Sequence, residues 1–411
     1  MSQPFARRLR AAAAGLLTVT MVTAAAGSPA TAAPAPGQIR YAGGTTAVPD
    51  SYIVVLKDRA VAHRADARTA ATRAASGLAS RYGATAVGHV YSAAIVGFEA
   101  RLSHRAARQL AADPTVAYVE QNHVVTASDV QVDPHWNLDR IDQRAAAPLD
   151  ARYHYTSSGQ GVTAYILDTG IRKTHVEFEG RAVDGFDAID GSLPADDCEG
   201  HGTHVAGTVG GRTYGVAKKV RLVSVRVLDC RGRATIDQVI AGIDWVTADH
   251  RAGEPAVANM SLGGSRSDAQ NDAVTNSIAD GVSYAIAAGN SAVDACQISP
   301  ASTPEAITVG ATWQDDSRTW FSNVGPCLDI FAPGVAVKSA YTGGDTWTRV
   351  MVGTSQAAPH VAGTAARVLS AHPSWTPAQV HAYLMANATA GTIPDPGPGS
   401  PNRVLYAPPA L

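Results

Sequence analysis

Short apolar runs alternate with amphipathic stretches along the last two thirds of the chain. The apolar runs are partly β-branched and lie at residues 162–167, 220–228, 257–260, 282–287 and 306–309. Helical periodicity appears between and after them, at Ile236–Asp249, Asp268–Asp280 and Gln356–Ala371. This alternation predicts an α/β fold, a mostly parallel twisted sheet with helices on both faces. Functional residues are then expected just after the strands, at the carboxyl edge of the sheet.

A smaller set of elements precedes this pattern. Strands are predicted at 52–56, 87–91, 95–100 and 116–120, and helices at 61–82 and 104–112, with Ser103 as a helix cap. The order strand-helix-strand-strand-helix-strand predicts a small α+β, ferredoxin-like domain. Residues 123–133 are interpreted as an exposed linker. The Pro- and Gly-rich tail, 392–411, is assigned no function.

The first 33 residues have the pattern of a signal peptide. Arg7, Arg8 and Arg10 form a basic start, Ala11–Ala26 carries no charge, and Ala30–Ala33 offers small residues for cleavage. A membrane anchor is the alternative, but a span needs about 20 apolar residues and this run is shorter and rich in alanine. We therefore expect export, with no membrane association afterwards.

Charge divides the remaining chain into two parts. Residues 34–128 hold 10 Lys/Arg and 6 Asp/Glu, whereas residues 129–411 hold 20 and 29. Opposite net charges favour attraction between the two parts. No dense Lys/Arg cluster is present, which argues against a nucleic-acid partner. We divide the chain into a signal peptide (1–33), a cationic domain (34–128) and an anionic main domain (129–411).

All four cysteines lie in the main domain, at positions 198, 230, 296 and 327. An even number in an exported chain favours two disulfides, and the order alone leaves three pairings open. A zinc site is the alternative, but no C-x-x-C spacing supports it.

Two candidate proton-transfer residues follow predicted strands. Asp168 ends an apolar run and precedes a Thr-Gly turn, which alone also fits a turn-capping role. His201 lies between two glycines at the start of a helix, where an imidazole can move a proton near neutral pH. His204 is three residues further on, so metal binding is an alternative. The metalloprotease helix needs H-E-x-x-H, however, and Gly202 follows His201.

Ser355 stands between a Gly-Thr turn and an Ala-rich helix. The free N–H groups of a helix N-terminus can bind a developing oxyanion, although a serine here can also be a simple cap. Asn290 follows Gly289 at the end of another strand and offers an amide donor for the same oxyanion. The stretch Ser261–Gly264 leaves a backbone edge where a peptide can pair as an added strand.

The combination is more specific than its parts, because a serine needs a base and the base needs an orienting carboxylate. Asp, His and Ser occur here in the subtilisin order. The motifs Asp168–Gly170, His201–Gly207 and Gly353–Ser355 resemble those of subtilisin-type serine proteases, in the proteinase K group and its aqualysin-like members. Tyr214–Ala217 and Phe331–Gly334 also match. Residues 52–121 resemble the inhibitory propeptide of that family.

The resemblance implies a role for each candidate residue. Asp168, His201 and Ser355 would form the catalytic triad, and Asn290 with the Ser355 amide the oxyanion hole. The substrate would lie along Ser261, Leu262, Gly263, Gly232, Arg233 and Ala234, and the residue before the cut would enter a pocket of Ala287, Ala288 and Gly289. The implied disulfides are Cys198–Cys230 and Cys296–Cys327. Structural Ca²⁺ is implied at Pro304, Ala306 and Asp329, and at Asp139, Asp142, Gln143 and Asp150.

The resemblance also has departures. Gln356 follows the nucleophile, where the family usually has Met, and the second calcium loop is one residue longer, with Arg152 in place of an expected ligand. Val205 replaces the free cysteine of proteinase K.

The implied protein is a secreted, monomeric serine endopeptidase that needs no cofactor for catalysis. It would be made as a zymogen, blocked by its own propeptide, and would cut itself near Ala127–Asp129. It would then cleave proteins and peptides after apolar or aromatic residues. The alternatives are an inactive protease-like binding protein, a secreted esterase, which the lack of a G-x-S-x-G stretch disfavours, and a zinc hydrolase at His201 and His204.

Overall fold

The computed structural model describes residues 37–43, 47–57, 67–124 and 129–411. The predicted signal peptide lies outside these ranges, and so do the beginning of the predicted helix at 61–82 and residues 125–128. The chain divides into two compact units, Met1–Val125 and Thr126–Leu411. Each unit is described by itself.

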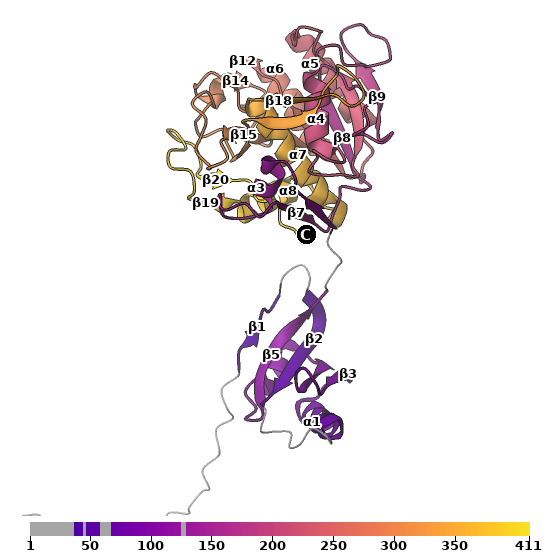
Figure 1. The fold of residues 1–411 in the computed structure, drawn as a ribbon, viewed down its shortest axis with the longest axis vertical. Helices are drawn as coiled ribbons and strands as arrows, with labels where there is room; N and C mark the ends of the chain where they lie inside the picture. The colour runs from indigo at the N-terminus through magenta and orange to yellow at the C-terminus, as the bar shows by residue number, and fades with distance from the viewer. Residues whose placement is uncertain (1–36, 44–46, 58–66, 125–128) are drawn as a thin grey trace, which may run out of the picture. The chain divides into compact units, whose positions relative to one another are not determined.

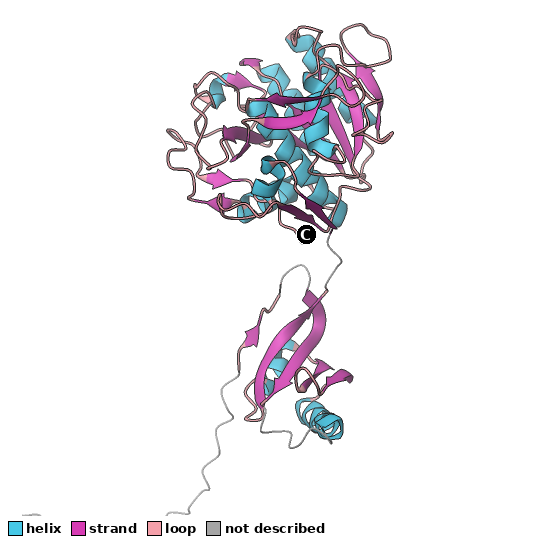
Figure 2. Cartoon of the chain, viewed as in Figure 1, coloured by secondary structure: helices cyan, strands magenta, loops and turns pink. Residues whose placement is uncertain are grey.

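The first unit has the predicted ferredoxin-like order, with one additional short strand at its beginning (Figure 2). Its elements are β1 (Ile39–Arg40), β2 (Ala47–Leu56), α1 (Ala67–Tyr82), β3 (Ala86–Tyr91), β4 (Gly97–Arg101), α2 (His104–Leu110) and β5 (Val116–His123). The strands form one sheet in the order β1-β5-β2-β4-β3. Ser103 caps α2, as predicted, by accepting a hydrogen bond from Ala106 N.

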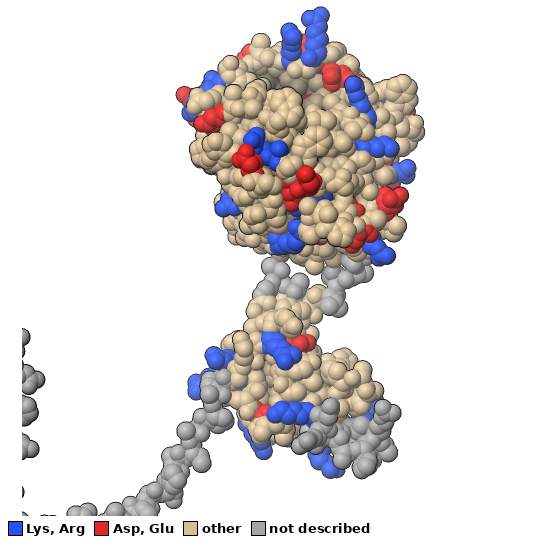
Figure 3. All heavy atoms as spheres, turned by 60° about the vertical axis from the view of Figure 1, so that its left-hand side comes forward, with Lys and Arg blue, Asp and Glu red and all other residues tan. Residues whose placement is uncertain are grey.

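The cationic character of the first unit is visible at its surface. Lys and Arg side chains outnumber acidic ones on the face that Figure 3 shows. The apolar core between its sheet and helices includes Val54, Phe98, Leu110 and Val119, all fully buried.

The second unit is built on a nine-stranded sheet in the order β19-β20-β16-β15-β13-β11-β8-β10-β9 (Figure 1). Neighbouring strands are parallel except for β19 and β20. The strands are β8 (Thr163–Asp168), β9 (Ala182–Asp187), β10 (Arg221–Arg226), β11 (Ala256–Met260), β13 (Val282–Ala287), β15 (Ile307–Thr312), β16 (Ile330–Pro333), β19 (Thr389–Ala390) and β20 (Arg403–Val404). The predicted mostly parallel α/β fold is confirmed.

Helices cover both faces of this sheet because its strands are apolar on both sides. In β8, Ala164 and Ile166 pack into the core formed with α4 (His201–Gly210) and α7 (Thr354–Ala371). The alternate residues Tyr165 and Leu167 pack on the other face against α5 (Ile236–Asp249) and α6 (Asp268–Asp280). This two-residue period follows from the pleat of a strand.

The predicted linker at 123–133 is partly wrong. Residues 129–132 form the strand β6 (Asp129–Val132), which pairs antiparallel with β7 (Arg152–Tyr155). The side chain of Gln131 donates to Thr213 O and accepts from the Lys218 ammonium. Pairing with β7 supplies backbone partners that the local sequence does not reveal. The short helix α3 (Trp136–Ile141) follows.

The C-terminal tail is part of the fold. The helix α8 (Pro377–Asn387) precedes it, capped by Thr376, and was not predicted. Leu405 N donates to Phe331 O, and Ala407 N donates to Ile141 O, so the tail adds the strand β20 between β16 and β19 and then crosses to α3. The sequence analysis did not predict this packing, because a segment rich in proline and glycine shows no helical or strand periodicity. In the described part of the chain, no helix is long and apolar enough to cross a membrane.

Candidate active site

The three predicted catalytic residues lie at the ends or beginnings of three elements. Asp168 is the last residue of β8, His201 is the first residue of α4, and Ser355 is the second residue of α7. The strand β8 lies inside the sheet, between β11 and β10. The site is therefore at the carboxyl edge of the sheet, where the alternating pattern predicted it.

Asp168 and His201 form a short, directed contact. His201 Nδ1 lies 2.8 Å from Asp168 Oδ1 and 3.0 Å from Oδ2, and the carboxylate side chain is fully buried. Burial lowers the pKa of His201, but the Asp168 charge and hydrogen bond outweigh it, with smaller contributions from Glu199 and Asp197. The pKa of His201 consequently lies above its ordinary value. The contact fixes Nδ1–H and leaves Nε2 free to accept a proton.

A second buried carboxylate, Asp197, fixes the turn that carries His201. Its Oδ1 accepts from the backbone N of Glu199 and Gly200, and its Oδ2 accepts from the N and Oγ1 of Thr203. Gly200 has φ 112°, and a Cβ there would lie 2.3 Å from the Tyr341 ring. Only glycine fits at this position.

Ser355 Oγ donates to Ser261 O at 3.1 Å, and Ser261 Oγ donates back to Ser355 O at 2.8 Å. Among the described residues no hydrogen bond joins Ser355 to His201. The serine has three staggered χ1 rotamers. A change of rotamer releases Oγ from Ser261, and the base is then its expected acceptor.

Asn290 is fixed through its oxygen. Asn290 Oδ1 accepts from Thr354 N at 2.8 Å and from Thr354 Oγ1 at 2.9 Å. Its Nδ2 and the Ser355 N both lie within 3.6 Å of the position that a Cβ on Gly353 would occupy. Gln356 Oε1 lies 3.0 Å from the same position. Two N–H donors therefore border one space beside a residue without a side chain, and such a pair can hold an oxyanion.

Two connected hollows lie beside these residues. The larger, about 560 Å³, is lined by His201 and Ser355 and by the predicted substrate residues Gly232, Arg233, Ala234, Ser261, Leu262 and Gly263. The smaller, about 330 Å³, is lined by Ala287, Gly289 and Asn290. Ala288 is fully buried in the core on the α5–α6 face and does not line either hollow, contrary to its predicted place in the pocket.

Several residues of the cleft escaped the sequence analysis. The larger hollow is also lined by Thr169, Glu199, Val239 and Gln270. Asn323 supports the Gly289–Asn290 turn by donating to Ala288 O and accepting from Ser291 N. Thr169 and Glu199 lie within two residues of Asp168 and His201, so their place in the cleft could have been predicted from the sequence. Asn323 is distant in sequence and gave none.

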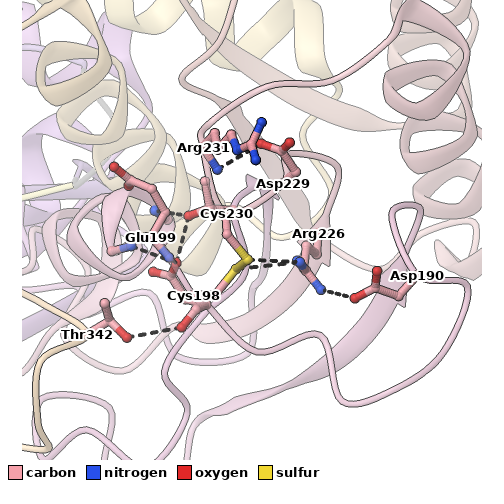
Figure 4. Close-up of a disulfide and its surroundings, with 12 residues drawn as sticks. Asp190, Cys198, Glu199, Arg226, Asp229, Cys230, Arg231 and Thr342 are labelled. Atoms are coloured by element: carbon pink, nitrogen blue, oxygen red, sulfur yellow. Dashed lines mark hydrogen bonds and ion pairs between the residues drawn. A yellow bond between two sulfur atoms is a disulfide. The ribbon is translucent and has the colours of Figure 1, made fainter.

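Both disulfides implied by the resemblance are present, Cys198–Cys230 and Cys296–Cys327. The first joins the turn before His201 to the loop that carries the cleft residues Gly232–Ala234 (Figure 4). Arg226 Nη2 lies 3.5 Å from Cys198 Sγ and 3.7 Å from Cys230 Sγ, while Nη1 binds Asp187 and Asp190. The two walls of the cleft near His201 are thus covalently linked.

His204 does not share a site with His201. Its Nε2 lies 3.1 Å from both Val337 O and Arg349 O, so this nitrogen carries a proton and donates. Burial, followed by the neighbouring His201, lowers the pKa of His204 to about 3. With Nε2 donating, the lone pair of His204 is on Nδ1, which is buried and has no hydrogen-bond partner among the described residues. His201 uses its own Nδ1 for Asp168, and in the described chain no three His, Cys, Asp or Glu side chains are grouped to hold a metal ion, so the zinc alternative has no support.

The two implied calcium sites differ in their fit. Asp329 already has partners for both oxygens, Thr308 N at 2.8 Å and His381 Nε2 at 3.3 Å. In the other site both oxygens of Asp139 also accept from backbone N–H groups, those of Asp150 and Ala151, and Asp142 Oδ2 accepts from His154 N. Asp142 Oδ1, in contrast, is buried and has no hydrogen-bond partner among the described residues. Burial raises the pKa of Asp142 to about 7. The hydrogen bond from His154 N lowers this pKa, and the negative charges of Asp150 and Asp139 raise it further. In the described chain no three His, Cys, Asp or Glu side chains are grouped to hold a metal ion. The one feature that favours a cation at the Asp139–Asp142–Asp150 loop is the unpartnered Asp142 oxygen, a hard donor of the kind Ca²⁺ prefers.

A buried carboxylate, an imidazole and a serine at a helix N-terminus, beside two convergent N–H donors, are the arrangement of a serine hydrolase. Comparison with known families makes the class specific. The model of the subtilase family matches residues 159–404, and the model of peptidase inhibitor I9 matches residues 51–128. The chain belongs to the subtilase family. It is a serine endopeptidase with an inhibitory propeptide domain.

Relatives of known name agree with this assignment. An extracellular serine proteinase of Thermus sp. (strain Rt41A) is 48% identical over 88% of this chain and 90% of its own length. An alkaline serine exoprotease A of Vibrio alginolyticus is 49% identical over 77% of this chain and 60% of its own. A crystal structure of a cold adapted subtilisin-like serine proteinase is similar with a TM-score of 0.65 and 49% identity, covering 67% of this chain and 98% of that one.

Proposed function

We propose that Ser355, His201 and Asp168 form the catalytic triad of a secreted endopeptidase. The observation that carries the proposal is the His201–Asp168 contact at 2.8 Å, which holds the imidazole with Nε2 available beside the serine helix. His201 Nε2 takes the proton of Ser355 Oγ as this oxygen attacks the peptide carbonyl. The same proton then passes to the departing amine. Water releases the acyl group by the same route in reverse.

The oxyanion that forms in each step would be held by Asn290 Nδ2 and Ser355 N. Thr354 supports this role, because it occupies Asn290 Oδ1 with two hydrogen bonds and so leaves the nitrogen for the substrate. The donors are fixed before the reaction, and preorganised donors give the largest effect on rate.

The smaller hollow would receive the side chain before the cut. Its lining contains no charged residue, and it includes Leu262, Ala287 and Ile298 with small glycine positions between them. A charged side chain would lose hydration there without an ionic partner. This supports a preference for apolar or aromatic residues at that position.

The precursor would cut itself near Ala127–Asp129, after which the cationic domain of residues 34–128 would remain as an inhibitor until degraded. The match of residues 51–128 to peptidase inhibitor I9 supports the inhibitory role of this domain. Residues 1–33 would direct export, in agreement with the extracellular name of the Thermus relative. The mature enzyme, 129–411, would act as a monomer on protein and peptide substrates.

Structural calcium would be held by Asp139, Asp142 and Asp150, with Gln143 nearby. The ion would supply positive charge to the buried, unpartnered Asp142 oxygen. The site of Asp329 with the carbonyls of Pro304 and Ala306 has less support, since Thr308 and His381 occupy the carboxylate. Catalysis itself would use the three triad side chains, Asn290 Nδ2 and the backbone N–H of Ser355, without a cofactor.

A fluorophosphonate probe tests the nucleophile directly. We expect the probe to label mature wild-type protein and to leave Ser355→Ala unlabelled, and casein cleavage to disappear in the same variant. Equal labelling of both proteins would assign the nucleophile elsewhere. Ser261→Ala is a matched control, because Ser261 lies in the same cleft but is not the proposed nucleophile. An inactive binding protein would be labelled in neither form, and an esterase would cleave esters but no casein.

Self-processing is tested with the purified Ser355→Ala precursor. We expect it to retain residues 34–128 in the absence of other proteases. Loss of that segment would require another protease or another nucleophile.

A further inference from the structure

One acidic side chain, Glu199, lines the cleft among the described residues and has no role in the proposed reaction. It is partly exposed, and it lies in the turn between Cys198 and His201 (Figure 4). Its position is fixed from three directions. Glu199 N donates to Asp197 Oδ1, Glu199 O accepts from Tyr341 OH, and Oε2 accepts from His201 N at 2.7 Å.

The carboxylate of Glu199 retains capacity for another partner. A carboxylate offers about four acceptor positions, and the His201 N–H occupies one of them. Within the described ranges, no Lys or Arg lies at ion-pairing distance from Glu199. A negative charge is thus held rigidly at the wall of an open cleft without a cationic partner.

The order of the strands shows which substrate residue would meet this charge. The Ser261–Gly264 stretch follows β11, and β11 lies between β13 and β8 in the sheet. On the β13 side is the smaller hollow of Ala287, Gly289 and Asn290; on the β8 side are Thr169, Glu199 and His201. Adjacent side chains of an extended peptide point in opposite directions. When the residue before the cut enters the smaller hollow, the side chain preceding it turns toward Glu199.

We propose that Glu199 determines specificity for a cationic side chain, Lys or Arg, at the second residue before the scissile bond. The proposal rests on the proposed function and deepens it. The long aliphatic stem of Lys or Arg would pack along Thr169 and the His201 ring, and its charged end would meet the carboxylate. Arg233 lines the same cleft, but its side chain is exposed, so solvent screens its repulsion of a second cation.

The test compares peptides that are identical except for Lys, Ala or Glu at this second position, with Phe before the cut in all of them. For the wild-type mature enzyme we expect kcat/KM in the order Lys, Ala, Glu, with Lys exceeding Ala by about threefold or more. High salt should reduce this ratio. In Glu199→Gln we expect the ratio of Lys to Ala to fall to about one.

A second readout separates specificity from positioning. Glu199 also raises the pKa of His201 and binds its N–H, so Glu199→Gln should change the rate for all three peptides together. Only the ratios report the proposed contact. In Glu199→Lys the order should reverse, with the Glu peptide cleaved best. Asp244→Asn, which removes the same charge from the exposed face of α5, is the control and should leave all ratios unchanged.

The outcomes distinguish the two proposals. If wild-type protein cleaves none of the peptides, the proposed function fails. If it cleaves all of them at equal rates, or prefers Glu, this inference is wrong while the proposed function stands. An unchanged Lys-to-Ala ratio in an active, folded Glu199→Gln would also overturn it.

Discussion

The Asp168 carboxylate lies 2.8 Å from His201 Nδ1 and has no exposed surface. Water does not compete for this contact, so the carboxylate determines both the tautomer and the orientation of the ring. It also outweighs the effect of burial on the pKa of His201.

Replacement of this carboxylate by an amide should abolish most activity without unfolding the protein. In Asp168→Asn the amide nitrogen would face Nδ1, which would place the imidazole proton on Nε2, the wrong nitrogen for a base. We expect kcat to fall by roughly 10⁴, the effect that the wrong histidine tautomer has in a Ser-His-Asp triad. Peptide hydrolysis measures the loss, and the thermal transition provides the check on folding. A variant within tenfold of the wild-type kcat would contradict the assignment.

Because two buried histidines resist protonation, we expect the free energy of unfolding to fall in acid. Burial lowers the pKa of His360 to about 4 and that of His204 to about 3, below the ordinary value near 6.5. The folded state therefore binds fewer protons than the unfolded state in this range. Their contribution is complete above pH 6.5 and is lost as the pH falls toward 4.

Chemical unfolding of the inactive Ser355→Ala protein at pH 8, 6 and 4 would measure this loss free of autolysis. His360 Nε2 lies 2.7 Å from Asn137 Nδ2, and Nδ1 lies 2.8 Å from Gln356 O. His360→Gln on that background should lower stability at pH 8 and flatten its dependence on pH. Parallel pH curves for the two proteins would show that His360 does not titrate as inferred.

The sequence predicted the sheet, most helices and the three motif residues, because each depends on local periodicity or on a glycine-framed motif. The sequence analysis missed residues and strands whose partners are distant in sequence. Asp197 and Asn323 fix the His201 and Asn290 turns through backbone hydrogen bonds, and neither stands in a recognisable motif. Strand β6 and the tail strand β20 exist through pairing with partners remote in sequence. The family resemblance placed Ala288 in the pocket, whereas its side chain is buried in the core just beyond the end of β13.

Replacing the buried Gln356 by methionine should stabilise the protein. Its side chain is buried, and Nε2 has no hydrogen-bond partner in the described residues. An unsatisfied buried donor costs about 1–3 kcal/mol, and methionine has a similar length without this donor. We expect Gln356→Met to raise the free energy of unfolding by about 1 kcal/mol or more, measured on the Ser355→Ala background. Gln356→Glu, which places a charge in the same space, should be strongly destabilising. A less stable Gln356→Met protein would show that the amide has a partner such as a water molecule.

Calcium binding gives the last prediction, because the two implied sites respond differently. If Asp139, Asp142 and Asp150 hold the ion, calcium should raise the melting temperature of the Ser355→Ala protein, and a chelator should lower it. Asp142→Asn should remove most of this response, since the amide supplies no charge to the ion. The same change should cost less stability without calcium, because it relieves the repulsion by Asp150 and Asp139.

The control is Asp329→Asn, which should retain the calcium response. If only Asp329→Asn lost the calcium response, the ion would instead be assigned to the site of Pro304, Ala306 and Asp329. An unchanged melting temperature with and without calcium in the parent protein would remove both sites.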